Sequence, residues 1–434
     1  MANYDKSNEL LERAVKVTPL GAQTYSKSYR YYCEGNAPAF IDKGEGCYLF
    51  DVDGNKFIDF VCALGPITIG YNNEDINNAV KNQLDKGISF SLQSPLEVEL
   101  AEKLIDIIPC AEMVRFVKNG GDATTSAIRL ARAFTGRDLV AMSGYHGMHD
   151  WSIGASENNR GVPEDVAKLT KTFEYNNIHS LKELFEKYPN EIAAVILEPI
   201  QANGPKDGFL EEVRELANEY GAVLIFDEVV SGFRYALGGA SELYGVVPDM
   251  AAFGKGMGNG LPISAVAGKR EIMELISEGV FVSTTFGGEA LSMAGSLAAL
   301  KILEGDGVYQ HIWTLGEKLK NGLEELVDKY DLNEVIIISG LPPHCGVEFE
   351  GKGSLDYLDI NSIYNQAMVR NGILTVGINN IMLSHSEKEI DLFLKAAEEA
   401  MVDIKQAIEE DSIDIILKGG KVDPVFKRNI VEEN

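Results

Sequence analysis

Residues 222–234 read AVLIFDEVVSGFR, and this stretch decides the fold because a wholly apolar run ends abruptly in two carboxylates. A continuous apolar run rich in β-branched and aromatic residues predicts a strand that is buried on both faces. Asp227 and Glu228 then stand at the carboxyl end of that strand. Such a strand is typical of a sheet that is covered by helices on either side.

The neighbouring sequence repeats this pattern on both sides. Upstream, the apolar run EIAAVILEPI (191–200) precedes the helix-like FLEEVRELANEY (209–220), and downstream come DMAAFG (249–254) and ISAVAG (263–268). Short apolar strands that alternate with helices predict an α/β domain with a mainly parallel sheet flanked by helices. We place this large domain at residues 61–310 and expect ligands at the carboxyl ends of its strands.

The two ends of the chain have a different character. Residues 1–60 contain a short helix at 5–17 and the stretch CYLFDVDGNKFIDF (47–60), whose two β-rich runs around Asp53-Gly54 predict a hairpin. Residues 311–434 alternate long helices with short β-rich runs, which is typical of an α+β domain. We expect the N-terminal and C-terminal segments to form a second, smaller α+β domain together.

Composition and charge argue against several classes of partner. The chain has 434 residues, and a nucleic-acid backbone would be repelled by its formal net charge of −27. Its five cysteines form no CxxC pair and its six histidines no HExxH motif, so we expect no metal site. The first 19 residues lack the apolar core of a signal peptide, and no run of about 18 apolar residues could span a membrane. A cytoplasmic protein is therefore the expectation.

A pair of glycines after another strand suggests an anion site. In VKNGGDATTSAIRLARAF (117–134), a strand ends at Val117, Gly120 and Gly121 follow, and a helix begins near Asp122. Backbone N–H groups at the glycines and at the helix N-terminus would point at a bound anion. A plain strand-to-helix turn explains the same residues equally well, since neither the Walker nor the dinucleotide-binding pattern is present.

The stretch FGKGMGNGLPIS (253–264) places one lysine, Lys255, among four glycines. A phosphate-binding loop is disfavoured because no helix opens directly after the glycines and Pro262 intervenes. A slack surface turn is disfavoured because apolar runs flank the loop on both sides. A buried lysine remains, whose pKa would be lowered so that its neutral amine could act as a nucleophile.

One cofactor explains these three stretches together. Pyridoxal 5′-phosphate (PLP) is an aldehyde that needs a lysine for a Schiff base, a pocket for its phosphate and an acid at its ring nitrogen. Lys255, the turn at Gly120 and Gly121, and Asp227 would supply these needs in that order. Taken alone, Asp227 and Glu228 could equally be a pair of acids that caps a strand terminus.

The chain also resembles the class III aminotransferases of the fold-type I PLP enzymes, within them the branch that includes glutamate-1-semialdehyde 2,1-aminomutase. The similarity is carried by LIFDEVVSGFR (224–234) and AFGKGMGNGLPISAVAG (252–268), and it runs from YLFDVDGNKFIDF (48–60) through TTFGGEALSMAG (284–295). The resemblance implies a seven-stranded-type sheet, a PLP-dependent enzyme, and a homodimer with shared active sites.

The resemblance further implies a role for each matching residue. Lys255 would form the Schiff base and move the proton, Asp227 would pair with the ring nitrogen, and Tyr145 would stack on the ring. The other cofactor contacts would come from Asn119, Gly120 and Gly121 at the phosphate, from Thr285 of the neighbouring subunit, and from His146, Glu198, Asn203 and Val229 around the ring.

Three candidate substrate residues lie where the sequence departs from the family. Lys27, with Arg30 three residues on, stands where the aminomutases carry an arginine, and the region around Asn379 has amides where many relatives have an arginine. A lysine lacks the bidentate fork of arginine, which disfavours glutamate-1-semialdehyde as the substrate. We expect an aminotransferase that moves an amino group between an amino donor and an aldehyde or keto acceptor. The alternative is a 1,2-aminomutase acting on glutamate-1-semialdehyde or a similar amino aldehyde, and a decarboxylase or racemase ranks lower.

Overall fold

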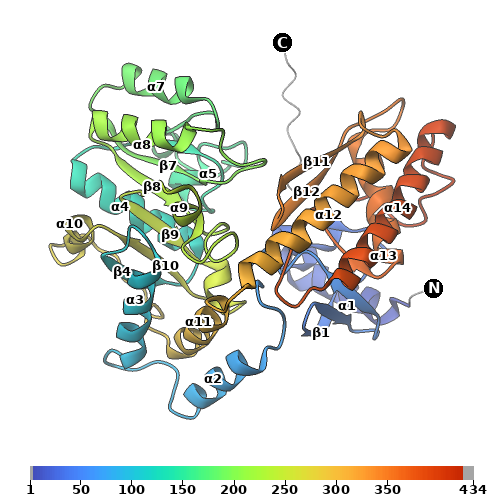
Figure 1. The fold of residues 1–434 in the computed structure, drawn as a ribbon, viewed down its shortest axis with the longest axis horizontal. Helices are drawn as coiled ribbons and strands as arrows, with labels where there is room; N and C mark the ends of the chain where they lie inside the picture. The colour runs from blue at the N-terminus through green and yellow to red at the C-terminus, as the bar shows by residue number, and fades with distance from the viewer. Residues whose placement is uncertain (1–2, 424–434) are drawn as a thin grey trace. The chain divides into compact units, whose positions relative to one another are not determined.

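The structure is a computed structural model, and it describes residues 3–423. The chain divides into two compact units, both drawn in Figure 1. The larger unit contains residues 65–69 and 73–309, and the smaller unit contains the residues up to 64, residues 70–72 and those from 310 onward. Residues from both ends of the chain therefore make up the smaller unit, as the sequence predicts.

A seven-stranded sheet forms the centre of the larger unit, in the order β4-β10-β9-β8-β7-β5-β6. The neighbours from β9 to β6 run parallel, whereas β10 is antiparallel to both β4 and β9. This arrangement confirms the predicted seven-stranded, mainly parallel sheet. The strands are β4 (Met113–Val117), β5 (Leu139–Ser143), β6 (Thr170–Thr172), β7 (Ile192–Leu197), β8 (Val223–Asp227), β9 (Met250–Phe253) and β10 (Ser264–Gly268).

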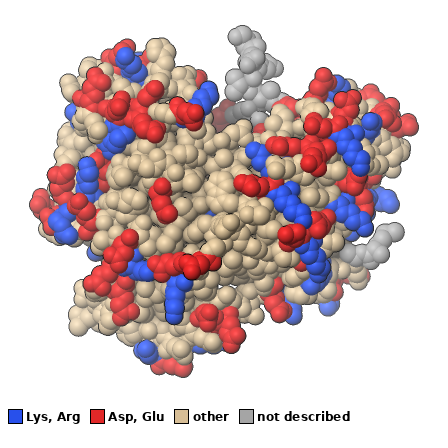
Figure 2. All heavy atoms as spheres, in the orientation of Figure 1, with Lys and Arg blue, Asp and Glu red and all other residues tan. Residues whose placement is uncertain are grey.

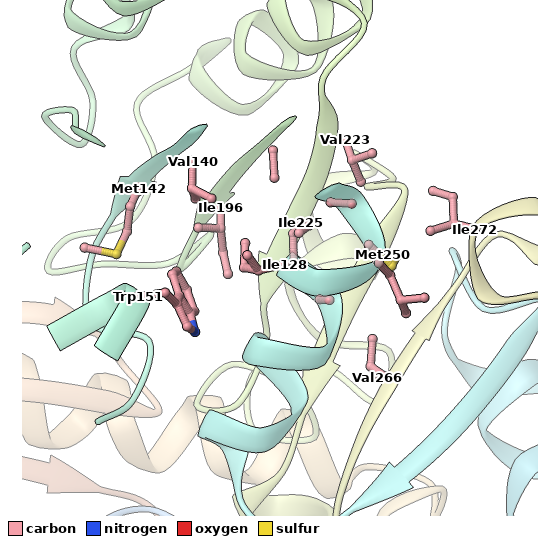
Figure 3. Packing of buried hydrophobic residues seen from close by; sticks show 14 of the residues in the cluster. Ile128, Val140, Met142, Trp151, Ile196, Val223, Ile225, Met250, Val266 and Ile272 are labelled. Carbon is pink, nitrogen blue, oxygen red and sulfur yellow. The ribbon is translucent and has the colours of Figure 1, made fainter. Parts of the chain in front are cut away.

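Helix α4 (Gly120–Thr135) packs against strands of this sheet from β4 to β7 and forms much of the core. Figure 3 shows Ile128 of this helix among the strand residues Val140, Ile196, Ile225 and Val266. Burying one such side chain contributes about 1.5–3 kcal/mol to folding. The other helices of the unit are α2 (Glu74–Leu84), α3 (Pro95–Ile107), α5 (Asp150–Ile153), α6 (Glu164–Ala167), α7 (Ile178–Lys187), α8 (Phe209–Tyr220), α9 (Gly239–Tyr244), α10 (Arg270–Met273) and α11 (Ala290–Leu303).

The strand register brings the predicted chemistry to one edge of the sheet. Asp227, the last residue of β8, pairs with Ala252 near the end of the parallel strand β9. Val117 at the end of β4 pairs with Ser264 at the start of the antiparallel strand β10, so the glycine pair lies at the same edge. Ligands of parallel sheets bind at the carboxyl ends of the strands.

The smaller unit combines two small sheets with long helices. Its sheets have the orders β1-β2-β3-β13 and β11-β12-β14. The predicted hairpin is present, because β2 and β3 pair antiparallel and the Asp51 carboxylate accepts hydrogen bonds from the N–H groups of Asp53 and Asn55 in the turn. The elements are α1 (Asp5–Val17), β1 (Ile41–Glu45), β2 (Tyr48–Asp51), β3 (Lys56–Asp59), α12 (Val308–Tyr330), β11 (Ile336–Leu341), β12 (His344–Phe349), α13 (Tyr357–Arg370), β13 (Ile373–Leu374), β14 (Ile378–Asn380) and α14 (Glu387–Glu410).

The acidic excess of the sequence forms no single patch on the face drawn in Figure 2. On this face, acidic side chains are scattered among basic ones. None of the helices within residues 3–423 has the length and apolar character that crossing a membrane requires.

Candidate active site

Asp227 and His146 form a buried pair at the carboxyl edge of the sheet. Nδ1 of His146 lies 2.7 Å from Oδ2 of Asp227, and Nε2 lies 3.1 Å from the carbonyl oxygen of Ser143. Both partners are acceptors, so both ring nitrogens donate and the imidazole is protonated. Burial by itself lowers the pKa of His146, but the hydrogen bond and charge of Asp227 outweigh burial and raise it. The Val229 N–H donates to the other carboxylate oxygen at 3.1 Å and fixes its orientation.

Lys255 lies two residues after the end of β9, behind Gly254, and begins a short 3-10 turn, Lys255–Gly258. Its backbone φ of +36° is a strained value for a residue with a side chain. The glycines on either side allow tight packing, since a Cβ on Gly254 would lie 2.7 Å from Oγ of Ser264 and one on Gly256 would lie 3.0 Å from Oγ1 of Thr68. The turn is therefore rigidly enclosed rather than slack.

The surroundings of Lys255 lower its pKa, and a lower pKa favours the neutral amine. Burial lowers the pKa of Lys255, the charges of Glu198 and Asp227 oppose this effect, and the charge of Arg234 adds to it. The net pKa lies below the usual range of a lysine. A lowered pKa at an enclosed lysine is what an amine nucleophile requires.

Glu198 stands at the end of β7 beside the same cluster. Its Oε2 accepts a hydrogen bond of 3.1 Å from the N–H of Tyr145. Burial raises the pKa of Glu198 and the nearby charge of Asp227 raises it further, while His146 and the Tyr145 N–H pull it down. Glu198, His146 and Lys255 thus meet at one edge with shifted pKa values, which is a frequent mark of a functional site.

The glycine pair predicted as an anion site forms the first turn of α4. A Cβ on Gly120 would lie 2.8 Å from both methyl groups of Val229, so the backbone approaches that side chain as closely as glycine allows. The carboxylate of Asp122 accepts from the N–H of Asn119 at 2.9 Å and anchors the turn in front of them. The first N–H groups of a helix have no partner within it, and they are therefore available to an anion.

The loop 144–149 is fastened to the start of α4 by hydroxyl groups. Oγ1 of Thr124 donates to the His146 carbonyl at 2.8 Å, and Oγ1 of Thr125 bonds Nδ1 of His149 at 2.7 Å. The indole N–H of Trp151 donates to Thr125 at 2.8 Å. These bonds hold His146 inward against Asp227, while the neighbouring Tyr145 side chain stays 61% exposed.

The structure leaves two other predicted cofactor residues at exposed positions of the larger unit. Asn203 lies in the loop between β7 and α8, and Thr285 lies in the loop that precedes α11. The cofactor roles of these residues and of Tyr145 stay predictions.

The three candidate substrate residues belong to the smaller unit. Lys27 is exposed at the end of a 3-10 turn, whereas the guanidinium of Arg30 is bound by the carboxylate of Asp423. Asn379 is fully buried, and its Oδ1 accepts from Oγ1 of Thr375 at 2.7 Å. Their substrate roles stay predictions.

One buried charge that acts on Lys255, Arg234, was missed, and Glu228, which was singled out beside Asp227, bonds a neighbouring helix instead. Arg234 is 1% exposed and donates to the Gly65 carbonyl at 2.6 Å and to Oγ1 of Thr68 at 3.2 Å. Glu228, also buried, accepts from Oγ of Ser231 and from the N–H groups that open α9. Both residues are charges within the largely apolar stretch 222–234, and this was their signal in the sequence.

Comparison with known proteins gives a consistent result. The family model described as Aminotransferase class-III matches residues 31–398. The chain is similar to a 3-aminobutyryl-CoA aminotransferase of Cloacimonas acidaminovorans (37% identity, 93% of this chain and 98% of the relative). It is also similar to a glutamate-1-semialdehyde 2,1-aminomutase 2 of Lachnoclostridium phytofermentans (42% identity, 81% of this chain and 86% of the relative).

Solved structures agree on the fold. The PLP internal aldimine form of the FumI protein of Sphingopyxis sp. MTA144 superposes with a TM-score of 0.86 at 26% identity, over 93% of this chain and 98% of that one. A transaminase with PLP bound superposes with the same TM-score of 0.86 and 26% identity, over 94% of this chain and all of that one.

Proposed function

Because this chain belongs to the class III aminotransferase family, whose cofactor is PLP, we propose that Lys255, Asp227 and their neighbours at the carboxyl edge carry out amino transfer. The amino group would move between an amino donor and an aldehyde or keto acceptor. One observation carries the proposal: a lysine with a lowered pKa shares its edge of the sheet with a buried acid and a glycine turn.

The residues at this edge fit PLP in size and charge. The cradle at Gly120 has no room for a Cβ, since Val229 would stand 2.8 Å from it, and the backbone N–H groups of Gly120 and Gly121 at the helix start suit a phosphate. Asp227 has the negative charge that a protonated pyridine nitrogen requires. Val229 then lies between the phosphate turn and Asp227, where one face of a flat ring would rest.

When bound, PLP supplies an electron sink for the carbon that loses its proton. Lys255 Nζ would hold the cofactor covalently. Once released, it would take the proton from the substrate carbon and deliver it to the C4′ carbon of the cofactor. Its lowered pKa increases the neutral fraction of the released amine, and only a neutral amine can accept that proton. The rigid turn around Gly254 and Gly256 would keep Nζ over the same place in both tasks.

Asp227 would hold the proton on the ring nitrogen, and His146 would hold Asp227 in place. Nδ1 of His146 lies 2.7 Å from the carboxylate and fixes its orientation. Glu198 would border the ring on its hydroxyl side together with Asn203, and Tyr145 would cover the ring's free face. Their roles follow from matching positions in the family.

The proposal is tested by following the visible absorbance of the purified chain supplied with PLP. A band at about 410–430 nm belongs to the lysine-bound cofactor. We expect this band to form and then to decay to shorter wavelength on addition of an amino donor, with release of the matching keto or aldehyde product. A colourless protein, or a band that no amine alters, would contradict the proposal.

Analysis of the reaction products separates amino transfer from aminomutation. In transfer, the carbon skeleton of the donor loses its amino group and appears as a keto or aldehyde product, whereas in aminomutation the same skeleton keeps one amino group, moved to the neighbouring carbon. The first compounds to test are those in the names of the similar proteins, 3-aminobutyryl-CoA and glutamate-1-semialdehyde. We expect transfer, because Lys27 offers no bidentate grip on a carboxylate.

We also propose a homodimer in which Thr285 reaches the phosphate of the neighbouring subunit. Thr285 is exposed, and large apolar side chains of the same unit are exposed as well, among them Phe90, Leu92, Phe281 and Phe286. Exposed apolar side chains in such numbers favour association. Light scattering coupled to gel filtration should give twice the mass of the 47.4 kDa chain.

We place the protein in the cytoplasm. All five cysteines are free and buried, which fits a reducing compartment. Fractionation of the source cells with an antibody against the chain tests this placement.

A further inference from the structure

An ion pair ties the glycine turn to the start of another helix. Nζ of Lys118 lies 3.1 Å from Oε2 of Glu289, and the two side chains are only 17% and 12% exposed. Lys118 is the residue between the end of β4 and the turn at Asn119, and Glu289 is the N-cap of α11. The pair therefore joins two elements that are about 170 residues apart in the sequence.

Glu289 is held firmly in its place. Its carboxylate accepts from the N–H of Leu291 and from Oγ of Ser292, both at 2.6 Å. Burial raises the pKa of Glu289, but the bonds from Ser292 and Lys118 outweigh burial and lower it. The carboxylate is thus ionised at neutral pH, and it offers Lys118 a fixed anchor.

The helix behind Glu289 also supports the lysine turn. Oγ of Ser296 on α11 donates to the carbonyl of Met257 at 2.8 Å. Gly295 lies so close to Leu261 that a Cβ there would collide with its side chain. Helix α11 therefore contacts the Lys255 turn through the middle of the helix and the Gly120 turn through Glu289 at the helix N-terminus.

The loop before α11 is fastened at its other end by the same two elements that flank the glycine turn. Arg115 of β4 donates to the carbonyl of Val282 at 3.1 Å, and Arg129 of α4 donates to the carbonyl of Phe281 at 2.6 Å. Residues 283–288, which carry Thr285, connect these bonds to the Lys118–Glu289 pair.

We propose that Lys118 and Glu289 are positioning residues for the cofactor phosphate. The pair sets the glycine turn and the Thr285 loop in one register, so that the turn presents its donors to the phosphate of its own subunit and Thr285 to that of the neighbouring subunit. The proposal rests on the proposed function, in which Gly120 and Gly121 of one subunit and Thr285 of its neighbour bind each phosphate. Lys118 acts through the loop rather than as a phosphate ligand, because Glu289 takes up its charge.

The test compares two cofactors that differ only in the phosphate. The full chain is freed of cofactor and titrated with PLP and, separately, with pyridoxal, and binding is followed by absorbance and tryptophan fluorescence. Loss of a coupled pair typically weakens binding several-fold, so we expect Lys118→Gln and Glu289→Gln to raise the Kd for PLP about tenfold. The Kd for pyridoxal should stay within about twofold of wild type because it has no phosphate to position.

Three variants serve as controls. Lys118→Arg keeps the charge and should restore PLP affinity. Lys103→Gln removes an ion pair to Glu304 at the opposite end of α11 and should leave both affinities unchanged. Lys118→Met replaces the side chain by an apolar one of similar length, and it provides a second test if Lys118→Gln folds poorly. It should weaken PLP binding to the same extent.

The outcomes separate this inference from the proposed function. Equal weakening for both cofactors, or no change with PLP, would overturn the positioning role. Tighter PLP binding by Glu289→Gln would overturn it as well, because Lys118 would then be a direct phosphate ligand. Failure of the wild-type chain to bind PLP would instead overturn the proposed function.

Discussion

The two ends of strands β8 and β9 carry the same kinds of residue for opposite purposes. At the carboxyl edge stand Asp227 and Lys255, and at the amino edge Asp249 stands directly before β9 with Lys269 nearby. Both edges bring an acid and a lysine to the same pair of strands. The difference lies in how completely each charge is satisfied.

At the amino edge the acid is saturated. Asp249 receives Nζ of Lys269 at 2.6 Å, Nη1 of Arg214 at 2.8 Å and the N–H of Leu224 at 2.8 Å. Burial raises the pKa of Asp249, but Lys269, the Leu224 N–H and Arg214 outweigh burial and lower it. Such an acid contributes to stability and has no capacity left for a ligand.

At the carboxyl edge Asp227 is paired with His146, whereas Lys255 and Glu198 have no ion pair within the described residues. Within the described chain no ion pair joins Lys255 to Glu198 or Asp227, although both acids act on its pKa. The pKa of Glu198 is raised and that of Lys255 is lowered, so burial disfavours both charged forms. Free energy that pairing would supply is forgone here, which fits the proposed role of Lys255 as an amine nucleophile.

Removing each lysine in turn should reveal the largest difference between the two edges. Lys255→Ala should lower kcat by at least about 1,000-fold, because loss of a nucleophile removes the main chemical step. The band of the bound cofactor should vanish as well. Lys269→Ala removes a lysine that is 47% exposed, so it should cost at most about 1 kcal/mol of stability and leave kcat unchanged.

Both variants are assayed for amino transfer and for thermal unfolding. If Lys269→Ala lost as much activity as Lys255→Ala, the two edges of the sheet would not differ in function.

Neutralising each acid should separate activity from stability. Asp227→Asn should lower kcat about 100-fold, because the ring nitrogen of the cofactor loses its charged partner. Asp249→Asn leaves Arg214 without its buried acceptor and should cost about 2 kcal/mol of unfolding free energy. Its kcat per folded molecule should match wild type.

Urea unfolding of the cofactor-free chain and initial rates on the holoenzyme supply the two measurements. A loss of activity in Asp249→Asn at a temperature where it is fully folded would contradict the division.

The carboxyl edge was predictable where the chemistry follows the strand pattern. Asp227 ends an apolar run and Lys255 follows the next strand, so the parallel pairing alone brings them to one edge. The glycine turn was predictable for the same reason, since it lies between a strand and a helix. The hairpin of the smaller unit follows from its own turn residues, Asp53 and Gly54.

The remaining parts depend on contacts that no local pattern encodes. His146 reaches Asp227 because hydroxyl groups of Thr124 and Thr125, on another element, fix the loop that carries it. Arg30 is taken by Asp423, and these residues are 393 positions apart in the sequence. The left-handed φ of Lys255 is imposed by its tightly packed neighbours and not by its own preference.

Adding one methyl group at the phosphate turn should sharpen the picture of the carboxyl edge. A Cβ on Gly120 would lie 2.8 Å from Val229, whereas one on Gly121 would meet its nearest atom, Cα of Gly147, at an ordinary 3.7 Å. Gly120→Ala should therefore raise the Kd for PLP about tenfold, and Gly121→Ala should raise it less than about threefold. Absorbance titration of the cofactor-free chain measures both values. Equal effects would mean that the Val229 contact does not shape the cradle.

The smallest expected effect is a pair of pH dependences of opposite sign. The folded-state pKa of Asp249 is lowered, so its stabilisation is complete above the unfolded value of about 3.9 and is lost as pH falls through the folded value. The folded-state pKa of Glu198 is raised, so its contribution is complete below about 4.3 and is lost as pH rises through the folded value.

Urea unfolding of wild type, Asp249→Asn and Glu198→Gln at several pH values tests both signs on the cofactor-free chain. The stability lost by Asp249→Asn should shrink as the pH falls below about 4. Glu198→Gln should gain stability relative to wild type as the pH rises, because the wild-type carboxyl must then ionise in a buried place. Parallel curves for the two variants would mean that both edges treat their acids alike. Opposite slopes would show that one sheet uses saturated pairing at one edge and incomplete pairing at the other.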